Sequence, residues 1–103
     1  MYNVPNELIK LAVGEAAFLE LLAEEASELA QASLKLARII RGENPTPVTK
    51  EEAMKNLSEE CVDVCLCIQT IGIPHDALME SYKRTRLIER LIASGRLNVK
   101  QED

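Results

Sequence analysis

The chain has few of the residues from which many active sites are built. Its only aromatic residues are Tyr2, Phe18 and Tyr82, and its only histidine is His75. A single histidine excludes a zinc site with several imidazole ligands, and nothing around His75 indicates a serine–histidine triad. Leucine, isoleucine and alanine must therefore do most of the packing, which favours helices.

Cysteines are also few, and they are not spaced as a metal or redox pair. Cys61, Cys65 and Cys67 fall within one expected helix and include no CxxC pair. Because Cys65 and Cys67 cannot point to one helix face, we interpret all three cysteines as reduced core residues of a cytoplasmic protein. No apolar run approaches the ~18 residues of a membrane span, and no secretory leader is expected.

Positive charge is in deficit, with 12 basic residues against 17 acidic ones and a formal net charge of −5. This balance argues against nucleic-acid polymers and anionic membranes as partners. With 103 residues, we predict one domain, 1–103, whose core suffices for folding but gains from dimerisation.

Glycine and proline divide the chain into helical segments. The predicted helices span about 5–13, 15–41, 50–71 and 74–94. A loop over 42–49 separates the second from the third, which begins at a capping box formed by Thr49 and Glu52. Pro74 suits the first turn of the last helix. Nothing reads as strand, so the predicted fold class is all-α, an antiparallel bundle of four to five helices.

The most informative feature of the sequence is an acidic pattern that occurs twice. Leu22-Ala-Glu-Glu-Ala-Ser-Glu28-Leu29 returns 35 positions later as Leu57-Ser-Glu-Glu-Cys-Val-Asp63-Val64. At about 100° per residue, each helix carries an apolar stripe. The predicted stripes are Leu22, Ala26, Leu29, Leu36 and Ile40 on one helix, and Leu57, Cys61, Val64, Ile68 and Ile71 on the other. Ser33 interrupts the first stripe, and its hydroxyl could bond the carbonyl one turn back.

The acids take the same positions relative to both stripes. Glu25 and Glu60 fall within the stripes, and Glu28 and Asp63 fall at their edges. Burying an unpaired carboxylate is so costly that the group would take up a proton instead, whereas a hard cation stabilises several carboxylates together. One such motif is usually a solvated helix face, but two at matching angles predict a divalent metal between the helices.

A di-iron carboxylate bundle is the alternative metal site. Such bundles use Glu-x-x-His on two helices, and Glu28 and Asp63 stand where those histidines would be. The sequence therefore disfavours this alternative.

The last helix carries much of the positive charge. Lys83, Arg86 and Arg90 recur at i, i+3 and i+7, and so share one face. From spacing alone, this face is either solvated or a grip for phosphate oxygens.

Taken together, these residues resemble the MazG-like superfamily of all-α nucleoside triphosphate pyrophosphohydrolases. The family signature is EExxE on one helix and ExxD on the next, and the matching residues here are Glu24-Glu25-Ala-Ser-Glu28 and Glu60-Cys-Val-Asp63. The resemblance runs from about Leu11 to Arg90 and implies an oligomeric MazG-like fold.

The resemblance implies Mg²⁺-dependent hydrolysis of a nucleoside triphosphate to the monophosphate and pyrophosphate, with Mn²⁺ as a substitute metal. The family's metal ligands correspond to Glu25, Glu28, Glu60 and Asp63. Glu24 would position or deprotonate the attacking water. Lys83 and Arg86 would hold the β and γ phosphates.

The resemblance also implies a homodimer or homotetramer. Independently of the resemblance, apolar residues are spread around much of the circumference of the first long helix. One small monomer could hardly cover all of them: Phe18, Leu19, Leu21, Leu34 and Ile39. With so few aromatics, the base would stack on Tyr2 or Phe18, although Phe18 falls on the apolar stripe. The alternative function is a catalytically silent helical oligomer that binds nucleotides or serves as an interaction module.

Overall fold

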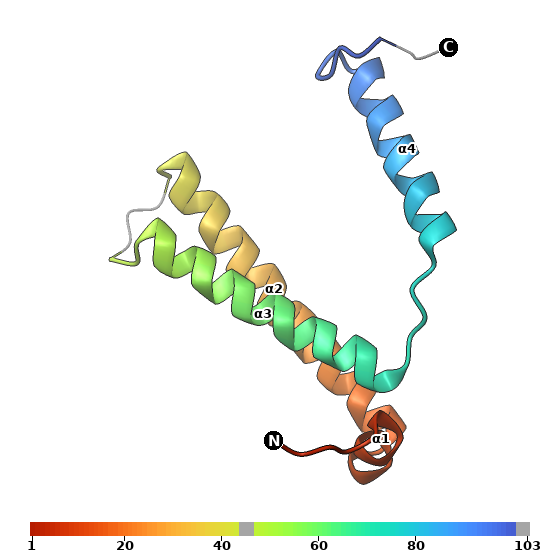
Figure 1. Ribbon diagram of the computed structural model, residues 1–103. Coiled ribbons are helices and arrows are strands. Elements are labelled where there is room, and N and C mark those ends of the chain that lie inside the picture. Colours follow the sequence, from red (N-terminus) through yellow and green to blue (C-terminus); the bar gives the residue numbers. More distant parts are fainter. Residues whose placement is uncertain (44–46, 101–103) are drawn as a thin grey trace. The chain divides into compact units, whose positions relative to one another are not determined.

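The computed structural model describes residues 1–43 and 47–100, and all regular structure within them is helical (Figure 1). The helices are α1 (Asn6–Val13), α2 (Glu15–Arg41), α3 (Lys50–Ile71) and α4 (Ala77–Ala93). The all-α class is therefore confirmed for the described residues. The predicted loop 42–49 includes 44–46, which lie outside them. The chain divides into two compact units, 1–73 and 74–103, and each is described by itself; the single domain, 1–103, stays a prediction.

The first unit is built on α2 and α3, which run antiparallel along each other (Figure 1). The residues buried in this unit are Phe18 and Leu36 from α2, and Ala53, Cys67 and Thr70 from α3. The expectation that Phe18 belongs to the core is confirmed, since only 6% of it is exposed. Phe18 is thereby removed as a candidate for stacking on a base.

The contact between the two helices is rotated from the predicted stripes toward the acids. Ala26, Ile40 and Cys61 were expected in the stripes but are exposed. Each helix can cover only one arc of the other, and the covered arc of α2 holds its one phenylalanine, Phe18, together with Leu36. The exposed arc holds alanines among a few leucines and Ile40.

Capping residues set the ends of α2 and α3 much as the sequence predicts. Gly42 ends α2 in the left-handed conformation at φ 68°, which glycine adopts without strain. The Thr49 hydroxyl accepts a hydrogen bond from the Glu52 amide at 3.1 Å, as expected for the start of a capping box. The Ser33 hydroxyl donates to the Leu29 carbonyl at 2.8 Å, so the expected back-bond is confirmed.

Helix α1 is attached to the carboxyl end of α3. Gly14 separates α1 from α2 with φ at 96°, outside the range of ordinary side chains. The Lys10 ammonium donates to the Ile71 carbonyl at 3.3 Å, and the Asn6 amide donates to the Gln69 carbonyl at 3.4 Å. Both carbonyls lie in the last turn of α3, where a cation also complements the helix dipole.

In the second unit, α4 begins later than predicted. The expectation that Pro74 lies in its first turn is wrong, because the helix starts at Ala77 with Asp76 as its N-cap. An Asp76 carboxylate oxygen accepts a hydrogen bond from the Met79 amide at 2.9 Å. His75 approaches Glu80 at 2.7 Å, across the same boundary. The capping carboxylate of Asp76, and not the proline, thus sets the first residue of α4.

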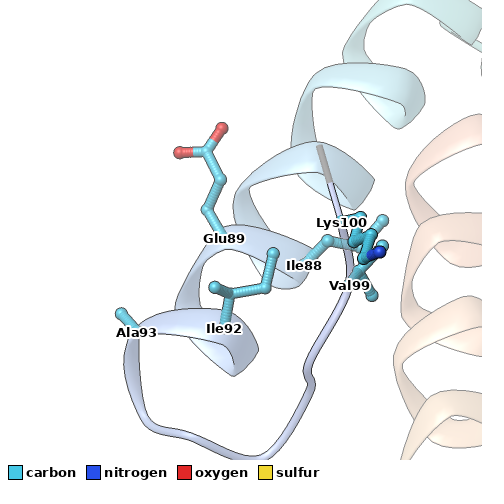
Figure 2. Close-up of a pocket in the computed structure, with 6 residues that line it drawn as sticks. All are labelled: Ile88, Glu89, Ile92, Ala93, Val99 and Lys100. Atoms are coloured by element: carbon cyan, nitrogen blue, oxygen red, sulfur yellow. The ribbon is translucent and has the colours of Figure 1, made fainter. Parts of the chain in front are cut away.

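The end of α4 and the segment after it enclose a hollow of about 480 Å³. Its lining is mainly apolar, with Ile88, Ile92 and Val99 beside one another in Figure 2. Two amides after the helix, those of Arg96 and Leu97, donate to the Leu91 carbonyl and turn the chain back. Within the described part of the chain, none of the helices combines the length and apolar character needed to cross a bilayer.

The cysteine expectation holds for one residue of three. All three thiols are free, and Cys67 is buried. Cys61 and Cys65 are exposed, so their assignment to the core is wrong. They lie on the arc of α3 that turns away from the contact with α2.

Candidate functional site

Glu25 and Glu60, the central acids of the two motifs, lie half-buried in the contact between α2 and α3. Both helices reach this contact through the apolar residues on either side of each acid, which fix the backbone around the carboxylates. Glu24, Glu28 and Asp63 are exposed. The helix pair thus buries one carboxylate from each motif and leaves the others at its edge.

Three of the four predicted metal ligands converge. One carboxylate oxygen each from Glu25, Glu60 and Asp63 lies within 4.8 Å of the other two. The fourth ligand, Glu28, lies outside this set of three oxygens but is near enough to influence the pKa of both buried glutamates. We call Glu25, Glu28, Glu60 and Asp63 the acidic cluster.

Burial and like charge both act on the two central acids. Burial of the carboxyl group is the largest cause that raises the pKa of Glu25, followed by the negative charges of Glu28, Asp63 and Glu60. Burial likewise leads for Glu60, whose pKa is also raised by the charges of Glu28, Asp63 and Glu59. The ionised cluster is therefore under electrostatic strain at neutral pH.

Two oxygens of the cluster have no protein partner among the described residues. Oε2 of Glu25 and Oε2 of Glu60 are buried and accept no hydrogen bond. Buried polar atoms are nearly always paired, because leaving one unpaired costs its full hydration. Two orphaned carboxylate oxygens beside a third acid form a donor set that suits a hard cation such as Mg²⁺.

Cys67 lies next to the cluster, which sequence reasoning did not anticipate. It is buried, and the pKa of its thiol is raised first by burial and then by the charges of Glu25 and Asp63. A protonated, buried thiol is neither a nucleophile nor a ligand for a hard cation. Cys67 follows Asp63 by four residues, about one turn of α3, and this spacing gives only a weak sequence signal for the proximity.

Glu24 and the basic residues of α4 lie outside the set of three converging oxygens. Glu24 is exposed and is absent from the three-oxygen set. On α4, Lys83, Arg86 and Arg90 line one hollow of about 260 Å³, so the expected shared face is confirmed. The Arg86 guanidinium lies 5.8 Å from the centre of the Tyr82 ring, a cation–π contact that restrains it. That this face binds phosphate stays a prediction.

Comparison of the chain with protein-family models, curated proteins and solved structures finds no match. A functional assignment therefore depends on the residues themselves and on the geometry of the acidic cluster.

Proposed function

We propose that the chain is a Mg²⁺-dependent nucleoside triphosphate pyrophosphohydrolase of the MazG-like kind, acting as a homo-oligomer. The observation that carries the proposal is the convergence of Glu25, Glu60 and Asp63 oxygens within 4.8 Å. The orphaned oxygens of Glu25 and Glu60 support it, since a cation would give them the partner that the protein does not.

In this proposal the acidic cluster holds the metal. Glu25 and Glu60 bind from the helix contact, and Asp63 and Glu28 bind from its exposed edge. When bound, Mg²⁺ offsets charge on phosphate oxygens and lowers the pKa of water in the site. Mn²⁺ has the same charge and also accepts oxygen ligands, so it is expected to substitute.

The remaining residues act on water and phosphate. Glu24 orients the attacking water and accepts its proton as the oxygen adds to the α phosphorus. The bond between that phosphorus and the bridging oxygen breaks, and pyrophosphate departs with the bridging oxygen. Lys83 and Arg86 pair with the β and γ phosphates and so stabilise the charge of the departing group.

The test is release of pyrophosphate from a panel of canonical and modified NTPs and dNTPs. We expect release with Mg²⁺, none with EDTA, and loss of release in Glu60→Gln. Glu59→Gln is the matched control, because it removes the same charge one residue away from an exposed position outside the cluster. Binding of nucleotide without hydrolysis would instead identify the silent interaction module, and the absence of Mg²⁺ binding would refute the metal site.

A further inference from the structure

We infer that Lys35 on α2 is a further phosphate-binding residue, which contacts the terminal phosphate of a triphosphate held at the acidic cluster. The inference rests on the proposed function and adds a residue that the resemblance does not assign. Lys35 belongs to the same compact unit as the cluster, residues 1–73. Its place relative to the cluster is therefore set by the packing of α2 against α3.

The contact between α2 and α3 follows a seam whose residues are spaced alternately four and three apart, as in a coiled coil. On α2 the seam residues, none of them exposed, are Phe18, Leu22, Glu25, Leu29, Ala32 and Leu36. On α3 the same spacings run from Ala53 to Ile71, and these seam residues are not exposed either. Because the helices are antiparallel (Figure 1), later residues of α2 lie beside earlier residues of α3. The convergence of Glu25 with Glu60 and Asp63 fixes the register.

This register makes Lys35 and Asn56 the next layer beyond the acidic cluster, on the same side of the seam. Lys35 follows Glu28 by seven residues, and Asn56 precedes Asp63 by seven. Seven residues fall within about 20° of two full helical turns, so each residue keeps the side of its helix that the acid occupies. At 1.5 Å per residue, the backbone of Lys35 lies about 10 Å beyond that of Glu28.

Lys35 has no acidic partner on its own helix. The side chain is half-buried, so its carbon stem packs beside the seam while the ammonium stays at the edge. The residues three and four positions away, which are its neighbours on the helix surface, are Gln31, Ala32, Arg38 and Ile39. Since none is an acid and Arg38 is a second cation, local pairing does not explain a lysine at this position.

Lys35 also has no charge partner across the seam. The residue opposite is the neutral Asn56. Two exposed acids, Glu52 and Glu59, stand on either side of Asn56 along α3. Within the described part of residues 1–73, neither of them nor any other carboxylate forms an ion pair with Lys35. A half-buried ammonium beside a helix contact is thus left available for an anion that the chain does not supply.

The side chains of the two layers lean toward one another. Long side chains on a helix point back toward its N-terminus, so Lys35 leans toward Glu28. Because α3 runs the opposite way, Glu60 and Asp63 lean toward Asn56 and the layer of Lys35. A phosphate chain held at the acids by Mg²⁺ therefore extends toward the ammonium. Lysine binds phosphate oxygens as a point charge, and this contact stabilises the charge of the departing pyrophosphate.

The test is calorimetric binding of Mg²⁺ alone, and then of nucleotides at saturating Mg²⁺, to wild type and Lys35→Met. The nucleotides are the α,β-methylene analogue of the best triphosphate in the panel and the corresponding monophosphate. We expect Lys35→Met to bind Mg²⁺ and the monophosphate as the wild type does. It should bind the triphosphate analogue about 10-fold or more weakly, since it loses a charged hydrogen bond to phosphate.

Lys55→Met is the matched control. It removes the same charge from an exposed position on α3, one residue from Asn56 but rotated about 100° away from it. We expect it to bind the triphosphate analogue as the wild type does. Lys35→Arg should restore most of the affinity, because it keeps the cation. Circular dichroism checks folding, and Lys35→Gln, which also suits a helix, replaces Lys35→Met if that variant is unfolded.

The outcomes separate this inference from the proposed function. A wild type that binds Mg²⁺ and releases pyrophosphate, with Lys35→Met equal to Lys55→Met, would overturn the role of Lys35 alone. So would an equal loss for the monophosphate, which would place the contact on the nucleoside or the α phosphate. A wild type that binds no Mg²⁺ would remove the metal site and the role of Lys35 together.

Discussion

The two sides of the α2–α3 pair are opposite in their physical chemistry, although the same helices form both. On one side, Glu25, Glu60 and Asp63 converge, and two carboxylate oxygens lack a partner. On the other, exposed alanine, leucine and cysteine side chains carry no charge. Within the described part of residues 1–73, no residue bonds these two oxygens, and the uncharged side chains stay exposed. One helix pair thus carries two different surfaces, one acidic and one apolar.

The largest effect should come from the acidic side. We expect Asp63→Asn to lower kcat for pyrophosphate release about 1,000-fold, because it weakens a metal ligand of the proposed site. Cys61→Ala, two residues away on the arc of α3 that turns away from α2, should leave kcat nearly unchanged. Steady-state kinetics of the two variants would check this. Equal losses in both would break the functional distinction between the sides.

The next effect separates buried from exposed leucines on α2. Only 5% of Leu36 is exposed, against 59% of Leu34. We expect Leu36→Ala to lower the free energy of unfolding by about 3 kcal/mol. In dilute, dissociated protein, Leu34→Ala should change it by less than about 0.5 kcal/mol. Urea denaturation measures both. A similar loss for both variants in dilute protein would mean that Leu34 is covered within the chain.

A smaller effect concerns pH. Because folding raises the pKa of Glu25 and Glu60, the folded metal-free protein binds more protons than the unfolded chain above about pH 4.5. Its stability should therefore fall as pH rises from about 4.5 through the raised pKa values. Thermal melts with EDTA should show this fall, and Glu60→Gln should reduce it. Saturating Mg²⁺ should raise the melting temperature at pH 7 on the order of 10 °C. A metal-free protein that gains stability over this range would contradict the assignment of strain to the cluster.

The smallest effect should come from the N-cap of α3, which lies far from both sides of the helix pair in function. Thr49→Ala removes the hydroxyl that accepts from the Glu52 amide at the start of α3. We expect a loss of about 1 kcal/mol of unfolding free energy. The variant should keep the wild-type response to Mg²⁺ and the wild-type association. A change in the Mg²⁺ response or in association would show that it depends on the stability of the first turn of α3.

Much of this architecture could be predicted from local sequence. Helix limits follow from residues within one turn, such as Gly42 and Thr49, whose conformation is set by their own side chains. The matching angles of Glu25 and Glu60 follow from the helical repeat alone. These features are local or periodic, so they survive whatever the rest of the chain does.

The features that sequence could not give depend on packing between segments. The exact arc of contact reflects how Phe18 and Leu36 fit against Ala53 and Cys67, which periodicity does not encode. The start of α4 depends on competition between Pro74 and Asp76, two helix-start signals only two residues apart. The attachment of Lys10 to Ile71 joins residues 61 apart in the chain and leaves no local pattern.

That attachment has a consequence for how the helix pair opens. Helices α2 and α3 follow one another in the chain and so are linked at one end of the pair, and the bonds from Asn6 and Lys10 hold the last turn of α3 at the other. Fraying from that end must first release α1. Amide hydrogens near Ile71 should therefore exchange slowly, and removing residues 1–13 should let exchange advance along α3 toward Glu60. Helix α1 thus stabilises the last turn of α3, which follows the acidic cluster, against local unfolding.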